Sequence, residues 1–231
     1  WAIVTIAAYR DSDAERKFIR LAFSRYLAPE VVKRIARNPD QLRLGGEARE
    51  VTVLFADIRD FTKRTERMLA EEVVHFINRV MTPLTREILK SGGGVDKYLG
   101  DGLMAYWNAP VDLENHANYA CSAALAMITE INNLNREIDE DVEKVAIGIG
   151  LNLGHAFAGN MGSEQRFDYS LVGDTVNVAA RLESTTKELG VDIVVSESIS
   201  MRAHNFVFVP LGDMKLKGRG SSVKIYHLFG K

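Results

Sequence analysis

Apolar residues repeat at helical spacing over the stretch from about residue 60 to residue 90. One face of such a helix would carry Val73, Phe76, Ile77, Val80, Met81, Leu84 and Ile88. This repeat of three- and four-residue steps predicts a long amphipathic helix. Gly92-Gly93-Gly94 then marks its end. Two further helices are expected over residues 113–136 and 174–188.

Short apolar runs of strand type lie between these helices. They are VTVLF (51–55), KVAIGIGLNLG (144–154) with AFAGN directly after His155, VDIVV (191–195), FVFVP (206–210) and VKIYHLF (223–229). The run VDKYLGDGLMAYW (95–107) predicts a hairpin that turns at Gly100-Asp101-Gly102. Hairpins mixed with helical crossovers predict an α+β fold, with helices on one face of a mixed, mostly antiparallel sheet.

The first 46 residues differ in pattern from the rest. Residues 12–38 indicate helix, and Gly45-Gly46 indicates a linker over residues 41–48. We therefore expect a helical linker or transducer segment, residues 1–46, before a globular domain, residues 47–231. The opening WAIVTIAAY is apolar but shorter than the roughly 20 residues of a membrane span. It is interpreted either as the end of a membrane helix in a longer protein or as a helix start packed on this chain.

Composition narrows the possible functions. The 231 residues are 46% hydrophobic and 26% charged, with a net charge of −2, which is typical of a globular domain. Near-neutral charge argues against a general nucleic-acid-binding protein, which usually carries a basic excess. The single cysteine, Cys121, allows no disulfide within the chain and no cysteine zinc cluster.

Two aspartates stand where a sheet edge could present them to a metal and a phosphate. Asp57 ends the strand 51–55, and Asp101 lies in the turn of the hairpin. Paired carboxylates repel, and Mg²⁺ favours carboxylates together with phosphate oxygens. The helix that IRDFT (58–62) would open has free N–H groups that attract a polyphosphate. By itself this signal is weak, because aspartate is common at tight turns.

Three segments in order carry a much more specific signal. VTVLFADIRDFT (51–62), GGGVDKYLGDGLMAYW (92–107) and RFDYSLVGDTVNVAARLE (166–183) resemble the signature blocks of class III adenylate and guanylate cyclases. KLKGRG (215–220) resembles the C-terminal block of that family. The resemblance covers about residues 47–229 and implies a ferredoxin-like catalytic domain.

The resemblance also implies roles for individual residues. Two divalent cations, Mg²⁺ or Mn²⁺, would be bound by Asp57, Asp101 and the backbone carbonyl of Ile58. The remaining matched positions would contact the nucleotide: Lys97 and Ser170 the purine, Asn177 the ribose, Arg181 the transition state and Lys217 the terminal phosphates. Phe61 and Thr62, at the helix start, would contribute backbone N–H groups to the phosphates.

Hydrogen-bond polarity favours ATP as the substrate. Lys97 can only donate and therefore suits N1 of adenine, whereas the Ser170 hydroxyl can accept from the N6 amino group. Guanylate cyclases of the family typically carry Glu at the position of Lys97. The expected activity is thus an adenylate cyclase that makes cyclic AMP and pyrophosphate. The alternatives are a guanylate cyclase and a catalytically silent dimerisation module.

In this family the metal aspartates and the nucleotide-reading residues come from different subunits, so the resemblance implies a homodimer with two equivalent sites. It also implies an upstream sensor or membrane domain, with the catalytic domain at the cytoplasmic face of the membrane. No nucleic-acid partner is expected. One departure from the family pattern is Asp60, which replaces a common glycine in the first block.

Overall fold

An eight-stranded sheet forms the centre of the computed structural model, which describes residues 44–137, 143–215 and 222–231. Seven strands follow the order β2-β3-β1-β4-β6-β8-β7, and β5 pairs with β4. All neighbouring strands are antiparallel except β4 and β6. The strands are β1 (Gly45–Ile58), β2 (Gly94–Leu99), β3 (Gly102–Trp107), β4 (Ile147–Gly162), β5 (Phe167–Val172), β6 (Ile193–Ser196), β7 (Val207–Lys215) and β8 (Ser222–Gly230).

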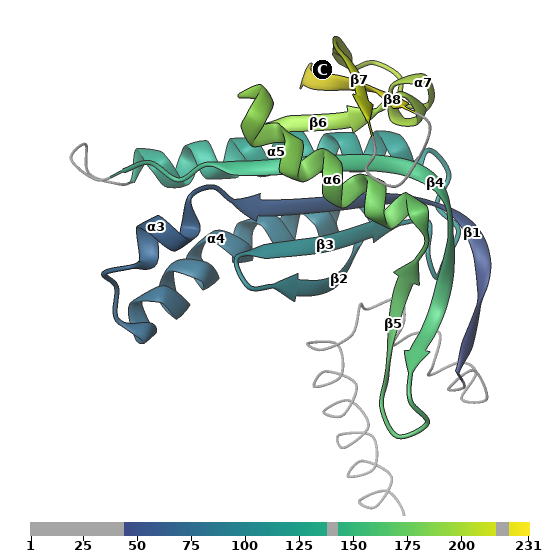
Figure 1. Ribbon diagram of the computed structural model, residues 1–231, viewed down its shortest axis with the longest axis horizontal. Helices are drawn as coiled ribbons and strands as arrows, with labels where there is room; N and C mark the ends of the chain where they lie inside the picture. Colours follow the sequence, from purple (N-terminus) through teal and green to yellow (C-terminus); the bar gives the residue numbers. More distant parts are fainter. Residues whose placement is uncertain (1–43, 138–142, 216–221) are drawn as a thin grey trace, which may run out of the picture.

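Two long helices, α4 (Ala70–Lys90) and α5 (His116–Arg136), cover one face of the sheet (Figure 1). The main core lies between them and the strands, because Leu84, Ile88 and Met127 pack with Leu54 and Ile149 from the sheet. The short helix α7 (Glu197–Arg202) adds Ile199 to the same core. Burial of this apolar face is what holds the helices on the strands.

Helix α6 (Asp174–Leu189) lies on the opposite face, so the expectation of helices on one face needs this correction (Figure 1). Its Ala179 packs with Val51 and Val53, which alternate along β1 with the residues of the main core. The helix α6 can approach β4 closely because Gly150 has no Cβ atom. A Cβ atom there would lie 2.2 Å from the Glu183 backbone nitrogen. The α+β class and the mostly antiparallel sheet are confirmed.

The predicted helix over residues 60–90 is two helices. The short α3 (Phe61–Thr65) ends before α4 begins. The Glu72 side chain accepts a 2.7 Å hydrogen bond from the Leu69 amide, which satisfies a backbone donor that a helix start leaves unpaired. A polar side chain therefore starts the second helix, although the apolar repeat alone suggests one continuous element.

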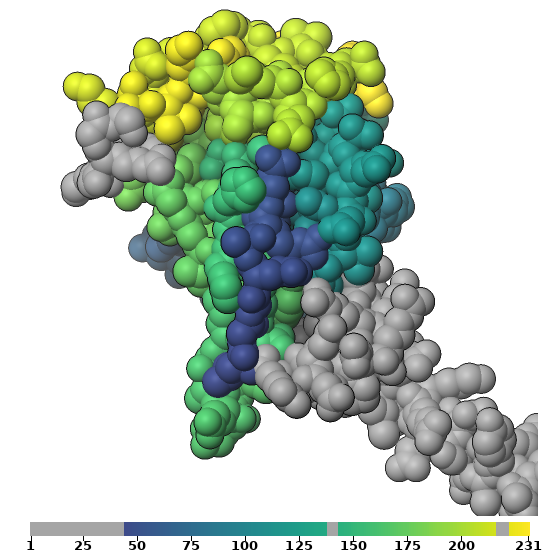
Figure 2. All heavy atoms as spheres, turned by 90° about the vertical axis from the view of Figure 1, so that its right-hand side faces the viewer, coloured from purple at the N-terminus to yellow at the C-terminus, as the bar shows by residue number. Residues whose placement is uncertain are grey.

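Residues 45–50 belong to β1, so the predicted linker over residues 41–48 is wrong for its described second half. Gly46 pairs with Gly159, and a Cβ atom at Gly46 would lie 2.2 Å from the Ala158 carbonyl oxygen. The glycines thus allow two backbones to approach closely instead of marking a flexible connection. The pairing joins the start of β1 to the arm formed by β4 and β5, seen at the lower side of Figure 2.

Residues 144–160 also differ from the prediction. One long strand, β4, begins at Ile147, where a strand followed by a shorter second strand was expected. The strand β5 was not predicted. The N-terminal helices and the apolar opening lie outside the described residues. No helix in the described ranges combines the length and the apolar character that a membrane span requires.

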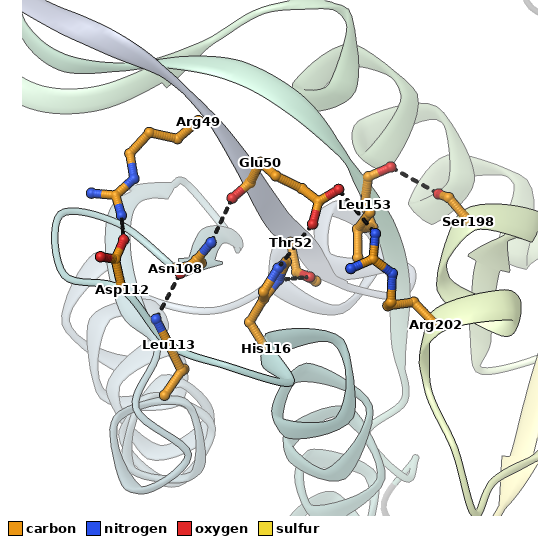
Figure 3. Close-up of polar contacts among 10 residues, drawn as sticks. All are labelled: Arg49, Glu50, Thr52, Asn108, Asp112, Leu113, His116, Leu153, Ser198 and Arg202. Carbon is orange, nitrogen blue, oxygen red and sulfur yellow. Dashed lines mark hydrogen bonds and ion pairs between the residues drawn. The ribbon is translucent and has the colours of Figure 1, made fainter.

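A polar cluster fixes β1 to the loop after β3 and to α5 and α7 (Figure 3). The buried His116 ring shares a 2.7 Å hydrogen bond with Thr52, and Glu50 lies 3.7 Å from the other ring nitrogen. Arg202 pairs with Glu50 at 3.2 Å. Asn108 donates to the Glu50 carbonyl oxygen at 2.9 Å. These contacts hold β1 in place several residues before Asp57.

Candidate active site

Sheet register brings Asp57 and Asp101 together. Asp57 lies at the end of β1 and pairs with Gly102, the first residue of β3. The Ile58 amide donates a hydrogen bond of 3.3 Å to the carbonyl oxygen of Asp101. The two carboxylates that the sequence assigns to metal binding therefore lie together where β1 ends and β3 begins, one on a strand end and one in a hairpin turn.

The electrostatics of Asp57 fit a cation. Burial and the nearby Asp101 carboxylate raise the pKa of Asp57 from its usual 3.8 to about 6. Its Oδ1 atom is buried and has no hydrogen-bond partner among the described residues. A buried carboxylate oxygen without a donor, beside a second carboxylate, is the environment that a divalent cation would stabilise. Oxygen donors also match the preference of Mg²⁺ and Mn²⁺.

Glu183 is a third carboxylate near this pair that sequence reasoning missed. Burial, Asp57 and Asp101 together raise the pKa of Glu183 to about 7. Its one sequence signal was its place at the end of the third block, two residues after Arg181. The described residues nevertheless contain no cluster of three or more acidic, histidine or cysteine side chains arranged to bind a metal. The candidate metal ligands therefore remain the two aspartates and the Ile58 carbonyl.

A cavity of about 800 Å³ opens beside the carboxylates. Three basic residues, Arg59, Lys63 and Lys187, also line it and offset part of the charge of its acidic residues. Thr62 lines it, whereas the Phe61 ring stacks on Phe76 at a centroid distance of 6.3 Å. Positive side chains, paired carboxylates and a helix start in one cavity can hold a polyphosphate together with its cation.

Asp60 adopts a left-handed backbone conformation, with φ at 54°. Glycine reaches this region without strain, and aspartate is among the residues that tolerate it. The carboxylate accepts a 2.7 Å hydrogen bond from Lys187 of α6, and this contact lowers the pKa of Asp60. The negative charge that departs from the family pattern is thus paired with a lysine at the cavity wall.

A second polar group lies on β2 and β5. Lys97 Nζ donates a 3.3 Å hydrogen bond to the hydroxyl of Ser170. The Ser170 hydroxyl in turn donates to Asp96 at 2.7 Å. The Asp96 side chain is 1% exposed and that of Lys97 is 47% exposed. The structure therefore brings the predicted base-reading pair together and adds Asp96, which the sequence reasoning did not single out.

Asn177 and Arg181 lie four residues apart on α6 and are both exposed. Neither side chain forms a hydrogen bond or ion pair with another described residue, and Arg181 makes none with Glu183. Lys217 lies outside the described residues. Neither Asn177 nor Arg181 lines the cavity beside Asp57 of the same chain, and the Lys97–Ser170 pair does not line it either.

Comparisons with known proteins identify the family. The sequence model of the adenylate and guanylate cyclase catalytic domain matches residues 46–230. "Adenylate cyclase 1" of Rhizobium meliloti (strain 1021) is 33% identical over 213 residues, which are 90% of this chain and 32% of that protein. The chain thus spans about a third of this relative.

Two solved structures are similar in fold. The adenylyl cyclase CyaB from P. aeruginosa gives a TM-score of 0.74 at 29% identity, covering 81% of this chain and 97% of that one. The guanylate cyclase domain of RhGC from Catenaria anguillulae, in complex with GTP, gives 0.70 at 29% identity, covering 80% and 99%. The family match, the fold and the positions of the carboxylates lead to one conclusion: this chain belongs to the adenylate and guanylate cyclase catalytic domain family.

Proposed function

We propose that this domain converts ATP to 3′,5′-cyclic AMP and pyrophosphate at two sites shared between the subunits of a homodimer. The observation that carries the choice of ATP is the contact between Lys97 and Ser170. The lysine can only donate, which suits N1 of adenine and opposes the N1–H of guanine. Once a bound purine covers these groups, an unpaired donor would be costly, so such a pair discriminates strongly between substrates.

The division of residues within one chain supports shared sites. Asp57 and Asp101 line the cavity, while Asn177 and Arg181 are exposed on α6 and do not line it. A two-fold axis would bring the exposed groups of one subunit to the carboxylates of the other, and would do so twice. Each dimer would then contain two equivalent sites.

The reaction requires positioning and charge neutralisation. The ribose 3′-hydroxyl gives up its proton to water as its oxygen forms a bond to the α-phosphorus, the bond from that phosphorus to the α,β-bridging oxygen breaks, and the electron pair of that bond leaves with pyrophosphate. Asn177 would orient the ribose for this attack, and Arg181 would hold the oxygens on which charge grows. A planar guanidinium suits those oxygens better than an ammonium group. Lys217, Lys187 and the backbone amides of Phe61 and Thr62 would hold the leaving phosphates.

Two divalent cations would be held by Asp57, Asp101 and the carbonyl oxygen of Ile58. When bound, they lower the pKa of the attacking hydroxyl and neutralise the leaving group. The unpartnered Oδ1 of Asp57 and the raised pKa of that residue support this assignment. The carboxylates bind a cation only when ionised, so cation binding should weaken as the pH falls below about 6.

Guanylate cyclase activity is the second candidate, because a domain in complex with GTP is among the similar structures. Turnover of ATP and of GTP with Mg²⁺ or Mn²⁺, followed by chromatography of the products, separates the two. Cyclic AMP as the main product supports the proposal. Cyclic GMP as the main product would favour a guanylate cyclase instead. If neither product forms, a silent dimerisation module is favoured.

The domain would act inside a longer protein. The matched Rhizobium protein is about three times as long as the shared region, which leaves room for a sensor or membrane domain. We propose that an upstream domain adjusts the dimer through the segment before residue 47 and that the catalytic domain lies at the cytoplasmic face of the membrane. Equal activity of residues 1–231 and residues 45–231, which keep all of β1, would contradict a regulatory role for residues 1–44.

A further inference from the structure

The hydroxyl of Ser170 lies between one group that can only donate and one that accepts. Lys97 Nζ donates to the hydroxyl oxygen at 3.3 Å, and the hydroxyl proton points to Asp96 Oδ2 at 2.7 Å. A hydroxyl has one proton and two lone pairs. Lys97 uses one lone pair and Asp96 uses the proton, so the second lone pair remains for a ligand.

A β-bulge makes this arrangement possible. Val95 pairs with Ala105 and Lys97 pairs with Met104, so the register shifts at Asp96. Neighbouring side chains of a regular strand point to opposite faces. The extra residue of a bulge alters this alternation, so Asp96 and Lys97 both reach Ser170.

The Asp96 side chain is too buried to contact a ligand directly. Its side chain is 1% exposed, and its Oδ1 atom is buried without a hydrogen-bond partner among the described residues. Burial raises the pKa of Asp96, and the hydrogen bond from Ser170 and the charge of Lys97 oppose this change. The Asp96 carboxylate can therefore influence the purine base only through the residues that it contacts.

We propose that Asp96 is a positioning residue for base selection, which fixes the Ser170 hydroxyl as an acceptor facing the purine. An acceptor there fits the N6 amino group of adenine and opposes O6 of guanine. This inference rests on the proposed function, in which Lys97 and Ser170 read the base. It adds a buried residue that sets the direction of the serine proton.

The test is the ratio of kcat/KM for ATP to kcat/KM for GTP, measured in Asp96→Asn, in Ser170→Ala and in the double variant. The amide of Asp96→Asn can donate as well as accept, so the hydroxyl loses its single direction. We expect the ratio to fall roughly three- to tenfold, the scale of one hydrogen bond. In the Ser170→Ala background the same change should alter the ratio by less than about twofold, because no hydroxyl remains to be oriented.

Asp168→Asn is the matched control for charge. Asp168 is exposed on β5 and acts on the pKa of Asp96 through its charge alone. Its variant should keep the wild-type ratio. A fall as large as that of Asp96→Asn would mean that charge, and not the hydrogen bond to Ser170, controls selection, and would overturn the proposal.

Thermal melting shows whether Asp96→Asn folds. Asp96→Ser, with a hydroxyl that also donates and accepts, takes its place if it does not. An equal fall of the ratio with and without Ser170, or an unchanged ratio in an ATP-preferring enzyme, overturns the inference alone. A wild-type enzyme that uses GTP at least as well as ATP contradicts the proposed function itself.

Discussion

Asp57 and Asp101 lie side by side because Asp57 pairs with Gly102, the residue that follows Asp101 in the chain. Their mutual repulsion adds to the effect of burial and raises the pKa of Asp57 to about 6. The arrangement costs stability when both groups are ionised and no cation is bound. This cost gives the candidate metal site a measurable signature.

The metal-free protein should lose stability as the pH rises from about 4 to about 6. The folded state binds the Asp57 proton more tightly than the unfolded chain, whose pKa is near 3.8, so ionisation in this window favours unfolding. Mg²⁺ or Mn²⁺ should raise the Tm by a few degrees at pH 7.5 and by less at pH 5. Asp57→Asn should remove both effects. A cation-induced rise that survives in this variant would place the metal elsewhere.

Gly150→Ala should destabilise the domain by about 1–3 kcal/mol or more. The added Cβ atom would lie 2.2 Å from the Glu183 nitrogen and 2.4 Å from the Ala179 carbonyl oxygen, both backbone atoms of α6. Urea unfolding measures the change, and turnover should fall because α6 carries Asn177 and Arg181. Gly230→Ala is the control, since a Cβ atom there meets nothing within 4 Å. Equal stability of the two variants would contradict the described packing.

Arg181→Ala should lower turnover by roughly 10²–10³-fold, the scale of losing one transition-state donor. Its melting temperature should match the wild type, because the side chain is exposed and has no partner among the described residues. Arg181→Lys should recover little, since an ammonium group lacks the planar array of donors. Arg79→Ala removes an exposed arginine of α4 that pairs with Glu137 at the end of α5, and should leave turnover unchanged. Near-normal turnover in Arg181→Ala would exclude this residue from the mechanism.

The His116 cluster should make stability sensitive to acid. Burial lowers the pKa of His116, an effect that the nearby Glu50 partly offsets. The unfolded chain therefore binds this proton more tightly, and stability should fall as the pH drops below about 6.5. His116→Asn keeps a group that can bond Thr52 and should flatten this dependence between pH 7 and 5. An unchanged slope in urea unfolding would assign the acid sensitivity to other groups.

The hairpin turn that carries Asp101 could be predicted because it depends on neighbouring residues, whereas the long-range contacts of the candidate site were expected only from the family resemblance. Asp101 follows from the hairpin turn, and the antiparallel pairing of β3 with β1 then brings it to Asp57. Lys97 and Ser170 are 73 positions apart, and only the family resemblance linked them before the structure showed their contact. The roles of Asn177, Arg181 and Lys217 remain predictions.

Asp96, Glu183 and the position of α6 were not predictable in the same way. A bulge in β2 turns Asp96 inward, and strand alternation alone would place it opposite Lys97. Glu183 approaches Asp57 because glycines in β4 allow α6 to pack closely on the second face of the sheet. Gly45-Gly46 was misread for a related reason, since close backbone pairing and flexible linkers both favour glycine.

Mixing two inactive variants tests the shared active site most directly. Asp57→Ala and Arg181→Ala homodimers should each be nearly inactive, whereas their heterodimer contains one intact site. Random mixing should thus restore about a quarter of the wild-type cyclic AMP synthesis, because half of the dimers carry one working site of two. The chain that carries both substitutions, mixed with wild type, should form only inactive heterodimers. Failure of the single variants to recover activity on mixing, in dimers shown to exchange subunits, would contradict the account.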